Sequence, residues 1–304
     1  MWDRIWANIQ IMIDIPVLTL GMIIDGFLIG GIFALIAYGL ALVWGVMNVK
    51  NLAQGDFVIL GAYITWWLYG HGLNPIFGIP ASFVALWVLG WIIYKLVISR
   101  VIAHDLFTSL LATFGIAIVM QQSMKIIFGA DEQTIALNIE SYGFFDDLLT
   151  IQPTRLIAFI SAIVLAILVI SFMKRSRMGQ AIRATAQNPR AARVMGIDTE
   201  KVYAFTFSLN AAICGAAGGL ISLIWEFQPF IGLIYSIRAF VIVTAAGLGN
   251  LAAVIAAGLG MGVIEQTGAF VFGTEFQQAI VVGLLVVVLL IKLVISSRRR
   301  EAVE

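Results

Sequence analysis

Long runs of apolar residues, separated by short polar segments, make up most of the chain. A helix that crosses the hydrocarbon core of a membrane needs about 20 mostly apolar residues. Such runs lie at 18–46, 57–70, 79–99, 107–129, 154–173, 203–225, 237–268 and 277–296. Pro16, Pro80 and Pro153 stand at the starts of runs, where a missing backbone N–H is harmless, so we expect no proline inside a helix. The pattern predicts an all-α fold, a polytopic transmembrane helix bundle that forms a single domain, 1–304.

The run 237–268 is too long for one ordinary span. As a single helix it would measure about 48 Å at 1.5 Å per residue, against a hydrocarbon core of about 30 Å. Its centre, 245–250, contains Gly247, Gly249 and Asn250, a combination typical of a helix break. We therefore predict two shorter segments, at 237–248 and 251–268, and about 8–9 membrane segments in all.

Glycines four residues apart occur in three of the runs. They are Gly26 and Gly30, Gly215 and Gly219, and Gly258 and Gly262. Small residues at this spacing let helix backbones approach closely in lipid. These positions are predicted helix contacts.

Composition agrees with a membrane protein. Hydrophobic residues make up 61% of the chain and charged residues 12%, and the mean hydropathy is +1.01. Soluble domains average about 25% charged residues. A soluble enzyme, a disordered chain and a nucleic-acid binder are therefore excluded, and the net charge of +1 indicates no charged macromolecular partner. We expect membrane lipid to surround the apolar surface of the protein.

The positions of the charges predict an orientation. Lys and Arg are enriched in cytoplasmic loops of membrane proteins. The loop 174–201 and the C-terminal tail are rich in both, whereas the loop 130–152 holds five acidic residues and no basic one. We expect the loop 174–201 and the C-terminus to be cytoplasmic, and the loop 130–152 and the N-terminus to be outside.

The loop 174–201 contains signals for a short helix. Asn188 suits an N-cap, Pro189 the first helical position and Gly196 the end. Ala191, Val194 and Met195 would share one apolar side. A helix this short is marginal alone in water, so it is predicted to dock a cytoplasmic protein. The alternative is a solvated loop that is basic only because it is cytoplasmic.

Polar residues at membrane depth are costly and usually face a bundle interior or a cavity. The candidates for a solute path are Asn48, Asn51, Gln54, Asp56, Gln121, Asn210 and Asn250. Hydrogen bonding between helices is the alternative for each. Asp25 and Glu265 lie within or near apolar runs and are expected to be either near an interface or paired.

Signals for enzyme chemistry are weak. The glycine pattern at 247–252 lies in an apolar run without the strand–helix context of a dinucleotide site, and we find no Gly-Lys-Ser/Thr phosphate loop. His71 and His104 lie in different loops, and the single cysteine, Cys214, is expected to pack in the core. We predict no catalytic residues, no metal site and no cofactor bound by this chain.

Two stretches resemble signatures of the branched-chain amino acid-type ABC importer permeases. They are residues 39–57, GLALVWGVMNVKNLAQGDF, and residues 176–197, SRMGQAIRATAQNPRAARVMGI. A third segment, from Phe230 through Arg238 to Gly249, resembles the C-terminal part of that family. The resemblance extends over nearly the whole chain.

The resemblance implies a permease subunit of the bacterial inner membrane. Its partners would be two ABC ATPase subunits that bind ATP and magnesium, a second homologous permease, and a periplasmic or lipid-anchored solute-binding protein. The loop 174–201 would contain the coupling helix that sits in a groove of the ATPase. The coupling residues would be Arg183, Asn188, Pro189, Arg190, Arg193, Val194, Met195 and Gly196.

Branched-chain amino acids are the first choice of substrate, followed by urea or short amides. The chain departs from the family pattern at Leu52 and Gln54, and at 245–253, where a proline and a glycine are absent. Two other classes of membrane protein would leave signs that the sequence does not show. A stand-alone secondary transporter or channel would show matched half-repeats with acidic residues at mid-membrane, and an integral-membrane enzyme would show clustered His, Asp or Glu.

Overall fold

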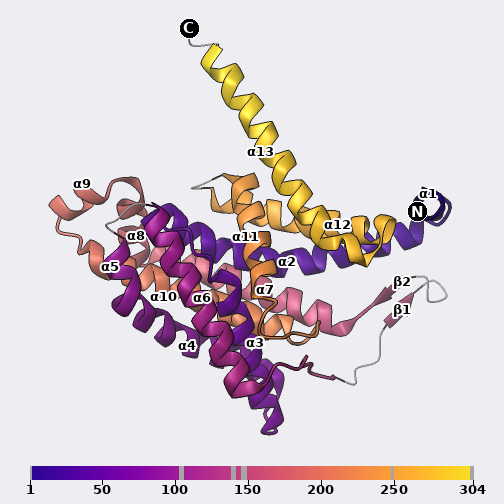
Figure 1. The fold of residues 1–304 in the computed structure, drawn as a ribbon, viewed down its shortest axis with the longest axis horizontal. Coiled ribbons are helices and arrows are strands. Elements are labelled where there is room, and N and C mark those ends of the chain that lie inside the picture. Colours follow the sequence, from indigo (N-terminus) through magenta and orange to yellow (C-terminus); the bar gives the residue numbers. More distant parts are fainter. Residues whose placement is uncertain (1, 103–105, 138–141, 145–148, 248–249, 302–304) are drawn as a thin grey trace.

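The computed structural model describes residues 2–102, 106–137, 142–144, 149–247 and 250–301, and within them the chain is almost entirely helical (Figure 1). The helices are α1 (Trp2–Asp14), α2 (Pro16–Met47), α3 (Gln54–Gly70), α4 (Pro75–Ile93), a π-helical turn (Tyr94–Ile98), α5 (Ser99–Val101), α6 (Leu106–Phe128), α7 (Pro153–Arg175), α8 (Arg177–Gln187), α9 (Pro189–Val194), α10 (Thr199–Ile221), α11 (Gly232–Ala246), α12 (Leu251–Phe272), a 3-10 turn (Thr274–Phe276) and α13 (Gln277–Glu301). His104, Glu140 and Asp146 lie outside the described residues.

Seven segments of the described chain are long and apolar enough to cross a membrane. They are Pro16–Met47, Pro75–Val101, Phe107–Phe128, Pro153–Arg175, Thr199–Ile221, Ala252–Phe272 and Thr274–Val294. The 17-residue α3 and the 15-residue α11 are shorter and pack within the bundle. The predicted polytopic helix bundle is confirmed.

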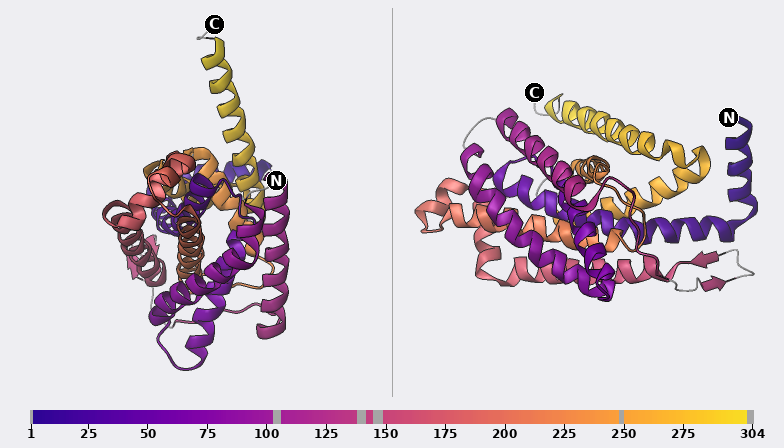
Figure 2. Two further views of the ribbon diagram at one scale, coloured as in Figure 1. Left: turned by 90° about the vertical axis from the view of Figure 1, so that its left-hand side faces the viewer. Right: turned by 60° about the horizontal axis from the view of Figure 1, so that its bottom comes forward.

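Helices α2 and α10 form the centre of the bundle. In the most apolar window of each, 89% and 94% of the residues are buried, whereas the corresponding value for α13 is 6%. Helices α3, α4, α7, α11 and α12 pack around this centre, and α13 projects away from it (Figures 1 and 2). The bundle has two ends. We call them the α9 end and the hairpin end, after α9 and the strands β1 (Tyr142–Phe144) and β2 (Leu149–Ile151).

The glycine pairs on α2 and α12 lie where these helices meet. A Cβ atom added to Gly26 would lie 2.6 Å from the Cα atom of Val263, and one added to Gly30 would lie 2.8 Å from the Cα atom of Leu259. Only a glycine leaves room for a backbone this close. The close approach that the spacing predicts is confirmed, and it runs antiparallel.

The long run 237–268 is broken, as predicted. Helix α11 ends at Ala246, Gly247 has a φ of +83°, and α12 begins at Leu251. The side chain of Asn250 caps α12 by accepting a hydrogen bond from the N–H of Ala253 at 3.1 Å. A positive φ is accessible to glycine at little cost, which explains why the helix stops here.

Two features differ from the sequence analysis. Pro80 lies inside α4 rather than at its start, because Asn74 caps the helix and places Pro75 in the first turn. The β1–β2 hairpin, with Gly143 paired to Thr150, was not predicted. Its acidic surroundings at 130–152 identify a loop, but a strand of three residues leaves no periodic pattern to read.

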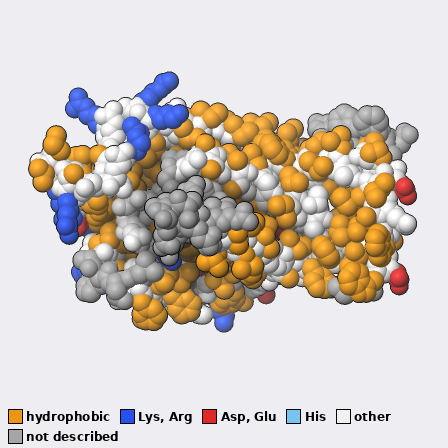
Figure 3. Space-filling view, turned by 90° about the horizontal axis from the view of Figure 1, so that it is seen from above, with side chains coloured by type: hydrophobic (Ala, Val, Ile, Leu, Met, Phe, Trp, Pro, Cys, Tyr) orange, Lys and Arg blue, Asp and Glu red, His pale blue; other side chains and the backbone are white. Residues whose placement is uncertain are grey.

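The surface shows the charge asymmetry expected of a membrane protein. On the face drawn in Figure 3, lysine and arginine side chains gather toward the α9 end, acidic side chains mark the hairpin end, and apolar side chains cover much of the surface between them. Many large apolar residues of α6, α7 and α13 are exposed, among them Val119, Leu168 and Leu293. An apolar belt between polar ends matches a lipid-facing surface.

Candidate functional site

Helix α9 begins and ends where its sequence predicts. The side-chain oxygen of Asn188 accepts hydrogen bonds from the backbone N–H groups of Arg190 and Ala191, both at 3.0 Å. Pro189 occupies the first turn, and Gly196, with a φ of +83°, turns the chain away after the helix. These caps are short-range, so the local sequence determines where this helix begins and ends.

The apolar tip of α9 is exposed. Val194 and Met195 expose 86% and 81% of their surfaces, and Ala191 is exposed beside them. The predicted grouping of these three side chains on one side is confirmed. Exposed apolar side chains flanked by arginines at one end of a bundle form a surface suited to a protein partner.

The underside of α9 ties it to the bundle. Ala192 is buried, and Nε of Arg193 donates a hydrogen bond to Oγ1 of Thr199 at 2.6 Å, at the start of α10. On α8, the Arg183 guanidinium donates to the backbone carbonyl of Met173, near the end of α7. A push on the tip of α9 would therefore reach both α7 and α10.

A second cluster of predicted residues lies deep inside the bundle, at the start of α3. Nε2 of Gln54 donates to the backbone oxygen of Ile36 at 2.9 Å, more than two helical turns before the end of α2. The connection 48–53 thus returns into the bundle before α3 begins. Asn51, Gln54 and Asp56 are buried.

Asn210 belongs to the same cluster. A Cβ atom on Gly39 would lie 2.5 Å from Oδ1 of Asn210 and 3.3 Å from Nε2 of Gln54, so both side chains occupy the space beside Gly39. Nε2 of Gln54 also lies 2.9 Å from the sulfur of Cys214. Within the described structure, Nδ2 of Asn210 is buried and has no hydrogen-bond partner. A buried donor of this kind is costly unless something else uses it.

Asp56 marks the place where α3 and α11 begin side by side. Oδ1 of Asp56 accepts a hydrogen bond from Nε2 of Gln121 at 2.9 Å and lies against Gly232, the first residue of α11. Oγ of Ser236 accepts from the N–H of Gly55 and donates to the carbonyl of Leu52, both at 2.8 Å. Two short helices therefore start together in the interior of the bundle.

Two of the predicted path residues do not join the cluster. Asn48 is exposed and ends α2 with a φ of +54°, and Asn250 is exposed and caps α12. Both have a local backbone role. Sequence reasoning missed Ser236 and the contact of Cys214 with Gln54. Those partners are about 160 to 184 residues away in the chain, so no local signal marks them.

Asp25 and Glu265 are both paired. The Asp25 carboxylate lies 2.8 Å from the guanidinium of Arg155, which joins α2 to α7. The Glu265 carboxylate receives two hydrogen bonds from Arg238, which joins α12 to α11. Between the two alternatives that the sequence left open, the structure selects pairing. No group of three or more metal-binding side chains occurs among the described residues.

A multi-pass helical bundle with an exposed, capped helix at one end and a buried polar cluster has the architecture of a membrane transport protein. A family model described as "Branched-chain amino acid transport system / permease component" matches residues 22–289. The chain belongs to this family of ABC transporter permeases. In such systems ATP is generally handled by partner ATPases, and the permease works with those ATPases and a binding protein.

Three relatives illustrate the similarity. The chain is 26% identical over 287 residues to the high-affinity branched-chain amino acid transport system permease protein BraD of Pseudomonas aeruginosa, covering 90% of this chain and 94% of the relative. It is 26% identical to LivH of Escherichia coli K12, with 88% and 91% covered. It is 28% identical to the probable branched-chain amino acid transport permease protein LivH of Methanocaldococcus jannaschii, with 84% of each covered. No solved structure matches the chain.

Proposed function

We propose that this chain, as one permease domain, is the transmembrane subunit of an ATP-driven importer that moves branched-chain or related amino acids across the bacterial inner membrane. The observation that carries this proposal is α9, a capped helix whose apolar tip, Val194 and Met195, is exposed at one end of a membrane bundle. Family membership and the names of the relatives support the substrate class.

Helix α9 is the coupling helix of the proposed importer. Val194 and Met195 insert into a groove of a partner ATPase, and Arg190 and Arg193 contact the rim of that groove. Asn188, Pro189 and Gly196 keep the helix rigid, while Arg183 and Arg193 connect it to the bundle. Closure of the two ATPases on ATP then moves α9. Transport follows only because the two states of the bundle make different contacts with the ATPases.

The buried cluster at the start of α3 is the proposed solute path. The amide and carboxylate groups inside the bundle come from Asn51, Gln54, Asp56, Gln121 and Asn210. Nδ2 of Asn210 has no hydrogen-bond partner among the described residues and would donate to a passing solute. Short helices that begin at membrane depth are a recurring device for solute sites in transporters. Asn48 and Asn250, exposed at helix ends, are not part of this cluster. A second homologous permease would complete the path.

The decisive variant carries Val194→Asp and Met195→Asp. Two carboxylates on the apolar tip cannot enter an apolar groove without losing their hydration, so we expect leucine uptake and co-purification of the ATPase both to fall at least tenfold. Uptake of radiolabelled leucine into cells measures the first effect, and affinity purification the second.

The matched control carries Val194→Ile and Met195→Leu, which keep the tip apolar and should leave both readouts near the unsubstituted level. Normal uptake by the aspartate variant, at equal abundance in the membrane, would disprove the coupling role of α9.

Urea or a short amide is the second candidate substrate. The departure from the family pattern at Gln54 favours it, because Gln54 places a neutral amide in the buried cluster, where it could bond to a neutral polar solute. Parallel uptake assays with leucine and urea separate the two. Uptake driven by an ion gradient without ATP would instead indicate a stand-alone transporter.

A further inference from the structure

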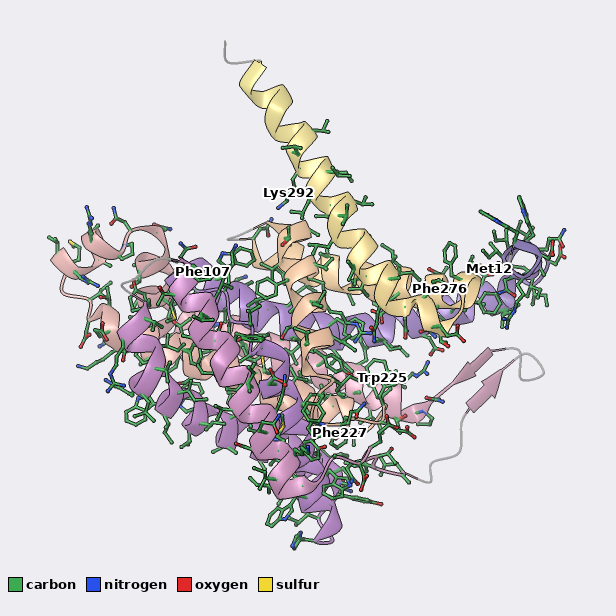
Figure 4. All side chains as sticks on the ribbon, viewed as in Figure 1. Met12, Phe107, Trp225, Phe227, Phe276 and Lys292 are labelled. Carbon is green, nitrogen blue, oxygen red and sulfur yellow. The ribbon has the colours of Figure 1, made fainter. Side chains whose placement is uncertain are left out.

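The ion pair between Arg238 and Glu265 lies in the wall of a pocket near the hairpin end. The pocket measures about 570 Å³ and is bounded by α11, α12, the turn at Thr274–Phe276, the start of α13 and the segment after α10. Figure 4 labels two side chains of this region, Trp225 and Phe276. A volume of this order accommodates a small organic solute.

The ion pair itself is well buried. The Arg238 and Glu265 side chains expose 12% and 4% of their surfaces. Nε of Arg238 lies 3.0 Å from Oε2 of Glu265, and its Nη2 bonds to Oε1. The guanidinium also lies over the rings of Phe33 and Tyr235, at 4.9 and 5.3 Å from their centroids. Burying two charges is expensive, so the arrangement calls for a role beyond stability.

The pair keeps unused hydrogen-bonding capacity. A guanidinium has five N–H groups. In the described part of the chain the Arg238 guanidinium donates to Glu265 and to no other residue, so its remaining N–H groups are available to the pocket. Each Glu265 oxygen likewise keeps a further lone pair. A donor edge and an acceptor edge thus lie side by side.

The chemistry of this site favours a solute with one charge of each sign. A carboxylate would bond to the free edge of Arg238, and an ammonium would bond to Glu265, without opening the ion pair. A lone anion or cation would leave a net charge buried. Trp225, Tyr235 and Ile231 line the same pocket and supply apolar surface for a side chain.

We infer that the pocket at Arg238 and Glu265 binds a zwitterionic α-amino acid with an apolar side chain, as the first site that the solute occupies on the bundle. The inference rests on the proposed function and names a second site for it, separate from the cluster at the start of α3. In the proposed orientation the pocket faces the side from which a binding protein delivers the solute. Exposed Glu226 and Glu275 on its lining disfavour free anions.

The direct test measures binding by thermal stabilisation of the importer complex, purified without its binding protein. The probes are L-leucine, leucinamide, which lacks the carboxylate, and 4-methylpentanoate, which lacks the ammonium. We expect leucine to raise the melting temperature and the two analogues to have at least tenfold weaker effects at equal concentration. Equal stabilisation by all three, or by none, would overturn the inference.

The paired variant Arg238→Met with Glu265→Leu removes both charges and keeps apolar bulk, a replacement that folded proteins often tolerate. We expect it to lose the leucine-induced shift and to raise the KM for leucine uptake at least tenfold. The control is Arg155→Met with Asp25→Leu, which removes the other interhelical ion pair and should leave both readouts unchanged. An unchanged KM and shift in the first variant would contradict the inference.

The single variant Glu265→Gln tests the same site without depending on whether the double variant folds. It leaves Arg238 without its carboxylate partner, so the site becomes cationic. We expect 4-methylpentanoate to stabilise this variant more than leucine does, the reverse of the order in the unsubstituted protein. A purely structural role of the pair would not reverse this preference, so an unchanged order of the two probes would rule the site out.

Failure of the proposed function gives a different pattern. If the importer carries another class of solute, the unsubstituted complex neither binds nor transports leucine. If only this inference is wrong, the unsubstituted complex transports leucine and the Arg238→Met, Glu265→Leu variant does so equally well.

Discussion

Two glycines on α12, only two residues apart, have opposite surroundings. Gly262 is buried, and a Cβ atom there would collide with the backbone of Gly26 and Gly30 on α2. Gly260 is exposed, and nothing lies within 4 Å of the corresponding position. The same substitution on the same helix therefore has two different consequences.

Gly262→Ala should destabilise the bundle by about 1–3 kcal/mol, because backbone atoms of α2 cannot move aside as a flexible side chain can. Gly260→Ala should be neutral or stabilising by up to about 1 kcal/mol, since alanine favours the helix. Melting temperatures in detergent measure both effects. Equal melting temperatures of the two variants would show that α2 and α12 are not in backbone contact.

At the scale of residues, the sequence predicts those contacts that a spacing encodes. Gly26 and Gly30 stand one helical turn apart, so they mark one stripe of α2, and the structure confirms the close contact there. Gly55 has no such pattern, yet a Cβ atom on it would meet the backbone of Gly232. That contact depends on how two distant segments fold back, which no local spacing records.

At the scale of elements, the hydroxyl of Ser236 joins the short helices α3 and α11. Oγ of Ser236 on α11 accepts a hydrogen bond from the N–H of Gly55 on α3 and donates to the carbonyl of Leu52. Ser236 is buried, so no water molecule could take over these hydrogen bonds if the hydroxyl were removed. The start of α3 is therefore held in place by α11.

Ser236→Ala should lower the free energy of unfolding by about 1–3 kcal/mol, because it leaves a buried N–H group unsatisfied. We also expect slower leucine uptake, since the cluster at Gln54 loses its support. Ser123→Ala is the control. Its hydroxyl only bonds to the carbonyl of Val119 on its own helix and is exposed, so its removal should change the melting temperature little. Similar effects of the two substitutions would argue against the link.

The difference between local and long-range contacts explains which elements the sequence could predict. The limits of α9 follow from Asn188, Pro189 and Gly196, which act within a few residues of one another. The return of the chain to the bundle interior before α3 was not predicted, because Gln54 is held by Ile36 and Cys214, which are distant in sequence. The sequence identified the polar residues there as candidates for a solute path, but not which of them meet in the structure.

At the scale of the whole molecule, charge and helix order together predict an orientation. Helix α9 lies at one end of the bundle and the β1–β2 hairpin at the other (Figure 1), and lysine and arginine side chains gather toward the α9 end (Figure 3). Between Lys201 and Lys292 the chain runs through α10, α11, α12 and α13. If each of these four helices crosses the membrane, Lys201 and Lys292 lie on the same side. This is the result expected if both belong to cytoplasmic segments.

Cysteine labelling tests this orientation, and the protein supplies its own control. Its single cysteine, Cys214, is fully buried, so the unsubstituted protein should not react with a membrane-impermeant maleimide. Asp131→Cys, exposed in the acidic loop, should be labelled in intact cells. Met195→Cys, at the tip of α9, should be labelled only after the membrane is opened and the ATPases are removed, because the ATPases cover it on the cytoplasmic side in the proposed importer. Labelling of Met195→Cys in intact cells would place α9 outside the cell, where it cannot contact a cytoplasmic ATPase. That result would disprove the coupling role of α9 even if the protein transports leucine.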